Sequence, residues 1–184
     1  LLLCNNYCFN TTYSATNQSQ LKKELEHNFI ELLQKHQNIV HKVCRIYTNN
    51  IDAHNDLFQE ITIQLWKAFP KFRGDSKFST WMYRVSLNTA ITLYRKNKRR
   101  IKTESFDTFQ FKLSGDDYDD TEEEQLKLLY KAVHQLNDID KALVFLYLED
   151  KNYNEISETM GISEVNARVK MNRIKKKLKT ILNP

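Results

Sequence analysis

Glycine and proline are almost absent from this chain, with 3 and 2 residues respectively among 184. A turn-rich β-sandwich or β-barrel needs many such residues to reverse the chain, so these folds are disfavoured. Neither GxGxxG nor GxxxxGK[ST] occurs, which disfavours the nucleotide-binding α/β enzymes that cradle phosphate in glycine-rich loops. Hydrophobic residues at 41% and charged residues at 28% are typical of a globular protein. The sequence therefore predicts an all-α fold.

The cysteines and the amino-terminal residues bear on the cellular compartment. Cys4, Cys8 and Cys44 are odd in number and lack the spacing of a disulfide framework. No apolar run reaches the length of a membrane span, and the first residues lack the basic and apolar regions of a signal peptide. We therefore expect a cytoplasmic protein with no direct membrane insertion. Residues 1–27, which begin rich in Asn, Thr and Ser, are expected to form a disordered leader.

Charge is unevenly distributed along the chain. Residues 103–125 contain nine acidic residues and one lysine, so the remainder must carry +13 to give the net charge of +5. Basic clusters lie on either side, at 95–102 and 168–179. This pattern suggests two polyanion-binding modules joined by a tether that DNA would repel. Solvated helix faces are the alternative explanation of the basic runs.

Apolar spacing of three, four and seven predicts helices over 28–48, 53–69 and 78–99. Asp52 is the expected N-cap of the second helix, and Pro70 its stop. Further helical stripes follow from about 124 onward. We expect four regions: a leader (1–27), a first helical domain (28–102), a flexible acidic linker (103–123) and a second helical domain (124–184).

Residues 155–176 carry the most specific local pattern, that of a helix-turn-helix. Ser157 supplies the small residue in the first helix, Gly161 the left-handed turn and Ser163 the N-cap of the second helix. Ala167, Met171, Ile174 and Leu178 are expected to face inward. The opposite face would then present amide, guanidinium and methyl groups to base edges, with lysines behind them for phosphates. The alternative is an ordinary αα-hairpin with a basic tail.

These segments together resemble the extracytoplasmic-function (ECF) sigma factors, the minimal two-domain promoter-recognition subunits of bacterial RNA polymerase. The resemblance covers about residues 28–182. In the first domain it is carried by DLFQE (56–60), LWKAF (65–69), FRGDSKFSTWMYR (72–84) and NTA (88–90). In the second domain it is carried by Tyr153 to Leu178.

The resemblance implies both partners and sites. Asp56, Gln59 and Glu60 would dock on the β′ clamp helices of core RNA polymerase, and the second domain would meet the β flap. The −10 non-template strand would be captured by Arg73, Phe78, Trp81, Tyr83, Arg84, Asn88, Arg95, Lys98 and Arg99. The −35 duplex would be read by Ser163, Val165, Asn166, Arg168, Val169, Asn172, Arg173 and Lys176. Aromatic rings also build hydrophobic cores. At least one of the three aromatic candidates Phe78, Trp81 and Tyr83, and Trp81 above all, is therefore expected to pack inside the protein instead of contacting DNA.

Other implications concern the linker and regulation. The acidic linker would thread the RNA exit path of the polymerase, with a plain solvated spacer as the alternative. An anti-sigma factor is an expected partner, and a small-molecule substrate is not. The chain departs from the family at Val165-Asn166-Ala167, where a small residue followed by Thr-Val is usual, so its −35 contacts are expected to differ from those usual in the family.

No catalytic or metal site is expected. Asp52, His54 and Asp56 alternate like metal ligands but would point in different directions from a helix, and His36 and His41 lack the HExxH spacing. Cys44 is expected to be a small core residue. The predicted function is promoter recognition and transcription initiation without cofactors or bond chemistry. The competing hypotheses are a stand-alone helix-turn-helix regulator and an enzyme with an unrecognised site.

Overall fold

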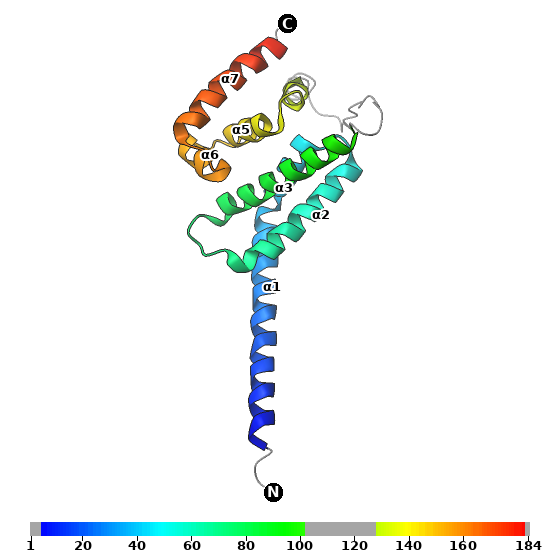
Figure 1. Ribbon diagram of the computed structural model, residues 1–184, viewed down its shortest axis with the longest axis vertical. Coiled ribbons are helices and arrows are strands. Elements are labelled where there is room, and N and C mark those ends of the chain that lie inside the picture. The colour runs from blue at the N-terminus through cyan, green and yellow to red at the C-terminus, as the bar shows by residue number, and fades with distance from the viewer. Residues whose placement is uncertain (1–4, 102–127, 183–184) are drawn as a thin grey trace.

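The structure, a computed structural model, describes residues 5–101 and 128–182 (Figure 1), and side chains in the first part from residue 20 to 98. All regular elements within these ranges are helical. The predicted linker, 103–123, lies outside the described residues.

Helix α1 (Asn5–Tyr47) is longer than its apolar pattern suggests. Residues 5–27, for which composition favours disorder, are helical here, and no glycine or proline interrupts the chain between them and Tyr47. The amino-terminal half projects away from the other helices (Figure 1). The carboxyl-terminal half buries Phe29, Val40, Val43 and Ile46. The part of α1 that organises the fold is therefore its second half.

Helix α2 (Ile51–Ala68) returns antiparallel to this half. Its N-cap is Asn50 and not Asp52: the Asn50 side chain accepts a hydrogen bond from the Ala53 amide at 2.7 Å. Asp52 lies in the first turn instead, where its charge complements the helix dipole. Leu57, Ile61 and Leu65 form the buried stripe. Pro70 ends the α-helix as predicted, inside the short 3₁₀ helix η1 (Phe69–Lys71).

Helix α3 (Phe78–Ile101) packs across both α1 and α2 to complete the first module. It is entered through a loop in which Gly74 has a φ of 79°, a value that favours glycine. Met82, Leu87 and Ala90 are buried at 1% exposure or less, which fixes the helix on its partners.

The second module comprises a helical segment at 128–134, α5 (Asp138–Leu148), α6 (Tyr153–Met160) and α7 (Glu164–Leu182). Asn137 caps α5, and Asn152 forms a capping box with Glu155 at the start of α6. Each cap satisfies amide groups that the first turn of a helix leaves without partners.

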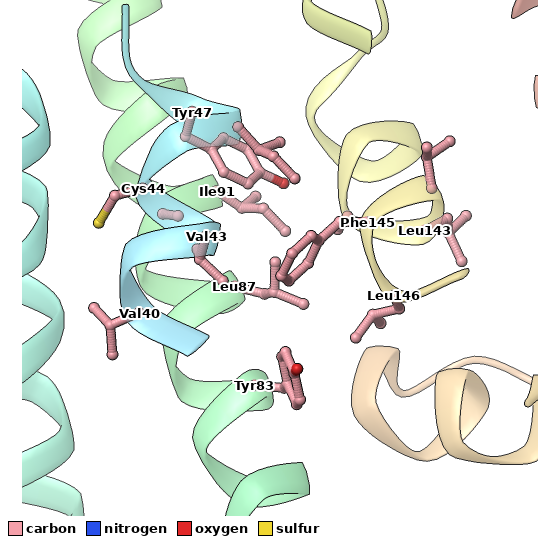
Figure 2. Close-up of a cluster of buried hydrophobic side chains, with 14 of the residues drawn as sticks. Val40, Val43, Cys44, Tyr47, Tyr83, Leu87, Ile91, Leu143, Phe145 and Leu146 are labelled. Carbon is pink, nitrogen blue, oxygen red and sulfur yellow. The ribbon is translucent and has the colours of Figure 1, made fainter. Parts of the chain in front are cut away.

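The two modules pack directly against each other. Helix α5 contacts α1 and α3, and α6 contacts α3. Figure 2 shows Phe145 of α5 pointing toward Leu87 of α3, with Tyr83 and Ile91 on the same side. The buried residues of both modules form one continuous hydrophobic cluster. The described part of the chain is therefore closed on itself.

Candidate nucleic-acid interface

The α6–α7 pair has the predicted helix-turn-helix geometry. Gly161 ends α6 in the left-handed conformation, with φ 66° and ψ 36°. The Ile162 amide donates to the Ser157 carbonyl at 3.2 Å, and the Asn166 amide donates to Ser163 Oγ at 3.2 Å, so Ser163 caps α7 as expected. The inward side chains Ala167, Met171 and Ile174 are at most 2% exposed, which confirms the predicted inner face of α7.

The opposite face of α7 is open to solvent. Val165 is 71% exposed and Val169 is 43% exposed, although both are apolar. Asn166, Asn172, Arg173 and Lys176 are exposed beside them. A helix that offers methyl, amide and guanidinium groups on one face has the chemistry that reads base edges in a major groove.

Two cations of this module are held by neighbours. Arg168 pairs with Glu164, with Nε 3.2 Å from Oε1, and lies 4.7 Å from the centre of the Tyr153 ring. Lys175 donates to the Tyr147 hydroxyl at 2.8 Å, and this hydrogen bond raises the pKa of Lys175. Arg168 is thus oriented, while Arg173 is free of any such constraint in its exposed position.

Helix α2 presents a polar stripe opposite its buried face. Asp56 and Gln59 are exposed, and Glu60 is half-buried, where it accepts a hydrogen bond from Gln64 Nε2 at 2.8 Å. Ile63, 44% exposed, lies one turn further along. A stripe of carboxylate and amide groups with an apolar edge can dock on a basic helical partner.

The aromatic residues at the start of α3 are drawn into packing. Phe78 and Trp81 lie 5.2 Å apart between ring centres, and each is within 5.6 Å of the Phe72 ring. Phe69 contacts both from η1. Arg73 is exposed on the adjoining loop. These two rings therefore support the loop that carries Arg73, and they remain only partly buried.

The other candidate −10 residues lie along α3 toward the second module. Tyr83 is 5% exposed, with its ring 5.9 Å from that of Phe145. Arg95 pairs with Asp138 of α5, and the Arg84 guanidinium approaches Gly161. Asn88 and Lys98 are exposed, and the side chain of Arg99 lies outside the described residues. The structure thus does not bring these residues and the loop together on one open face.

Several contacts between the modules had no signal in the sequence. Lys42 of α1 donates to both carboxylate oxygens of Glu149, at 2.8 and 2.9 Å, and the Tyr83 hydroxyl donates to Glu149 Oε2 at 3.0 Å. The Tyr47 hydroxyl donates to the Asp138 carbonyl at 2.7 Å. Burial raises the pKa of both tyrosines. These residues lie far apart in sequence, so only the folded chain reveals their relation.

Two histidines meet between α1 and α2. His41 Nδ1 and His54 Nε2 are 3.0 Å apart, and the Phe58 ring stacks on His41 at 4.5 Å. Burial and the neighbouring His41 lower the pKa of His54. Among the described residues no three His, Cys, Asp or Glu side chains gather in a way that could hold a metal ion. Cys44 is buried as predicted, and burial raises the pKa of its thiol to about 12.

Comparison with known proteins agrees with this architecture. Residues 32–100 match the family model for sigma-70 region 2, and residues 126–178 match the model for sigma-70 region 4. The chain therefore belongs to the sigma-70-type RNA polymerase sigma factors. Within that class it belongs to the ECF-type sigma factors, as its relatives indicate.

Two of those relatives are ECF RNA polymerase sigma-E factors. The one from Haemophilus influenzae is 27% identical over 83% of this chain and 86% of the relative. The one from Escherichia coli K12 is 26% identical over 70% of this chain and 75% of the relative. The predicted family and the all-α fold are thereby confirmed.

Two solved structures share the fold. One is the sigma factor RpoE in complex with the anti-sigma factor NepR from Bartonella quintana, with a TM-score of 0.64 at 15% identity, covering 87% of this chain and 97% of that one. The other is CnrH in complex with the cytosolic domain of CnrY, with a TM-score of 0.62 at 17% identity, covering 86% and 89%. No helix of the described residues is long and apolar enough to cross a membrane.

Proposed function

We propose that this sigma factor binds core RNA polymerase through α2, reads a −35 duplex with α7 and captures a −10 strand with the loop and outer face of α3. The observation that carries the proposal is the exposed face of α7, where Val165 and Val169 are solvent-accessible beside Asn166, Asn172 and Arg173. A solvated face seldom holds two exposed valines a turn apart, whereas thymine methyl groups offer them an apolar partner in the major groove.

The division of labour follows the two modules. Residues 28–102 would serve polymerase binding and the −10 element, and residues 124–184 the −35 element and the β flap. The acidic segment 103–123 would join them. Such a protein does no bond chemistry, because the polymerase supplies it, and it needs no cofactor. We place it in the cytoplasm, where promoter DNA is available.

Regulation by an anti-sigma factor is part of the proposal. One solved structure of the same fold, the sigma factor RpoE, was determined in complex with the anti-sigma factor NepR. A protein of this kind would bind the sigma factor and withhold it from the polymerase.

The polymerase-binding assignment can be tested with the variant Asp56→Ala/Gln59→Ala/Glu60→Ala. Truncation of interface hot spots costs about 2 kcal/mol or more, so we expect core polymerase to be bound at least about thirtyfold more weakly, and co-purification to be reduced or lost. The exposed residues Glu24, Glu31 and Gln34 of α1 offer a matched control triple variant. Unchanged co-purification of the α2 variant, with helical content preserved by circular dichroism, would remove α2 from the proposal.

A further inference from the structure

Two imidazole rings from different helices face each other near the end of α1 and the start of α2. His41 Nδ1 lies 3.0 Å from His54 Nε2, and the two rings are inclined by only 15°. Asp52 and Asp56, which flank His54 in the sequence, are exposed on α2. The nitrogen partner of His54 therefore comes from α1, and the pair takes no part in the proposed polymerase and DNA sites.

The distance between the two nitrogens fits a metal chelate. An imidazole nitrogen binds a divalent transition metal at about 2.0–2.1 Å, so two nitrogens 3.0 Å apart subtend an angle of roughly 90–100° at the ion. Adjacent ligands in square-planar and octahedral coordination have this angle. Tetrahedral coordination, which Zn²⁺ prefers, would separate the nitrogens by about 3.3 Å. The spacing thus favours Ni²⁺ or Cu²⁺ over Zn²⁺.

We propose that His41 and His54 form a binding site for a divalent late transition-metal ion, Ni²⁺ or Cu²⁺, which links α1 to α2. Imidazole nitrogen is a ligand that suits both ions. Water fills the remaining positions, because the described residues bring no third His, Cys, Asp or Glu side chain to the pair. Each neutral ring then carries its one proton on the nitrogen remote from the ion. The site is independent of the promoter-binding function.

Packing holds the two rings in place before any ion binds. The Phe58 ring stacks on His41 with ring centres 4.5 Å apart. The Asn50 side chain accepts a hydrogen bond from the Ala53 amide at 2.7 Å, which fixes the start of α2 immediately before His54. A chelate built on two helices that are already packed loses little conformational entropy when it binds its ion.

The charges around the pair act in two directions. Burial, His41 and Arg45 lower the pKa of His54, so its ring is neutral at pH 7 and can act as a ligand. The same Arg45 charge repels a metal cation. Lys42, beside His41 in the sequence, is paired with Glu149 at 2.8 Å. Two neutral ligands next to a guanidinium group define a site of moderate affinity.

Isothermal titration calorimetry of the full chain with NiCl₂ at pH 7.5 tests the site, since Ni²⁺ does not oxidise the cysteine thiols. A chelate is lost when either ligand is removed. We therefore expect His41→Asn and His54→Asn each to bind Ni²⁺ at least about tenfold more weakly than the wild type. His27→Asn, at an exposed position of α1, is the matched control and should leave the affinity unchanged.

Thermal unfolding provides a second readout, because the ion bridges two helices of the folded chain only. Ni²⁺ at ten times its Kd should raise the Tm of the wild type and of His27→Asn by about 3–6 °C. Both site variants should shift by less than about 1 °C under the same conditions. Each shift is measured from the metal-free Tm of the same protein, so a less stable variant still gives an answer.

The possible results separate the alternatives. Unchanged Ni²⁺ affinity in either single site variant overturns the chelate, and absence of Ni²⁺ binding to the wild type overturns the site. An equal rise in Tm in the wild type and both site variants means that Ni²⁺ binds elsewhere on the chain. Zn²⁺ binding that is tighter than Ni²⁺ binding overturns the choice of metal. Failure of the proposed promoter function changes none of these measurements.

Discussion

The ammonium group of Lys141 in α5 lies 4.6 Å from the centre of the Tyr94 ring in α3, and this contact joins the two modules of the chain. Lys141 is 1% exposed, a rare degree of burial for a lysine. The Tyr47 ring lies on the same ammonium at 5.9 Å. Burial lowers the pKa of Lys141 to about 8, helped by Lys98 and opposed by Asp138. The chain thus keeps a costly cation where α5 meets α1 and α3.

Replacement of Lys141 tests how much its burial lowers the free energy of unfolding. Because the folded pKa is about 8 and the unfolded value 10.5, the folded state is penalised while the group is protonated, and the penalty is relieved as pH rises from 8 toward 10.5. Lys141→Met should therefore raise the free energy of unfolding at pH 7 by about 1–3 kcal/mol. The advantage should shrink by pH 9.5, as measured by urea unfolding at both pH values. A variant that is less stable than the wild type at pH 7 would contradict this.

His134, in the helical segment 128–134, predicts sensitivity to acid. Burial and the nearby Lys141 lower the pKa of His134 to about 4. A backbone hydrogen bond at Arg45 raises this pKa, but its effect is smaller. The unfolded chain then binds more protons below pH 6.5, so stability falls between pH 6.5 and 4. We expect the wild type to lose about 1–2 kcal/mol more than His134→Gln between pH 7 and 5. If chemical denaturation shows that the free energy of unfolding depends on pH in the same way in both proteins, His134 is not the source of the acid sensitivity.

Gly161 tests the turn of the helix-turn-helix. Its φ of 66° is disfavoured for alanine, while the nearest atom to an added Cβ is the flexible Arg84 guanidinium at 3.9 Å, so the cost is backbone strain and not a clash. Gly161→Ala should lower stability by about 1 kcal/mol, and Gly161→Asn by less, since asparagine tolerates this conformation. Thermal unfolding measures both. Equal stability of the alanine variant would mean that the turn has another conformation.

Arg173 and Arg168 should both contribute to DNA binding, but their replacement should differ in its effect on stability. Arg173 is exposed on α7, whereas Arg168 is held by Glu164 and Tyr153. Each variant, Arg173→Glu and Arg168→Glu, should weaken binding to a −35 duplex by about 1–3 kcal/mol without changing affinity for core polymerase. Arg168→Glu should in addition lower stability, because it faces Glu164. Electrophoretic mobility shifts at fixed salt give the affinities, and wild-type affinity in Arg173→Glu would exclude α7 as the reading helix.

Local patterns in the sequence predicted most of the helices and the helix-turn-helix. The helix-turn-helix can be predicted from Gly161, Ser163 and the 4-3-4 spacing that starts at Ala167. Its turn conformation, its cap and its buried stripe each depend only on residues close together in the sequence. The cap of α2 was misplaced by two residues, because Asn50 and Asp52 are both good capping residues and only the backbone geometry separates them. The composition of residues 1–27 predicts disorder, whereas residues 5–27 are helical, because a helix can extend through polar residues when no glycine or proline interrupts it.

The contacts between the modules could not be predicted. Lys42 and Glu149 are 107 residues apart, and Tyr83 and Glu149 are 66 apart. Lys141 stands in a run of otherwise apolar buried residues, Ala142 to Leu146, and nothing in its identity signals burial beneath two tyrosines. For the same reason the sequence offered Tyr83 and Arg95 as open DNA contacts, whereas the folded chain covers the first and pairs the second.

Run-off transcription tests the whole account most directly. Purified core RNA polymerase is mixed with this chain and fragmented genomic DNA of the source organism, and the transcripts are sequenced to locate their start sites. The account predicts transcripts that start at a small set of sites with shared −35 and −10 sequences, that depend on added sigma factor, and that are lost with the α2 triple variant. Transcripts no different from those of core enzyme alone, from a chain that is folded and binds DNA, would contradict it.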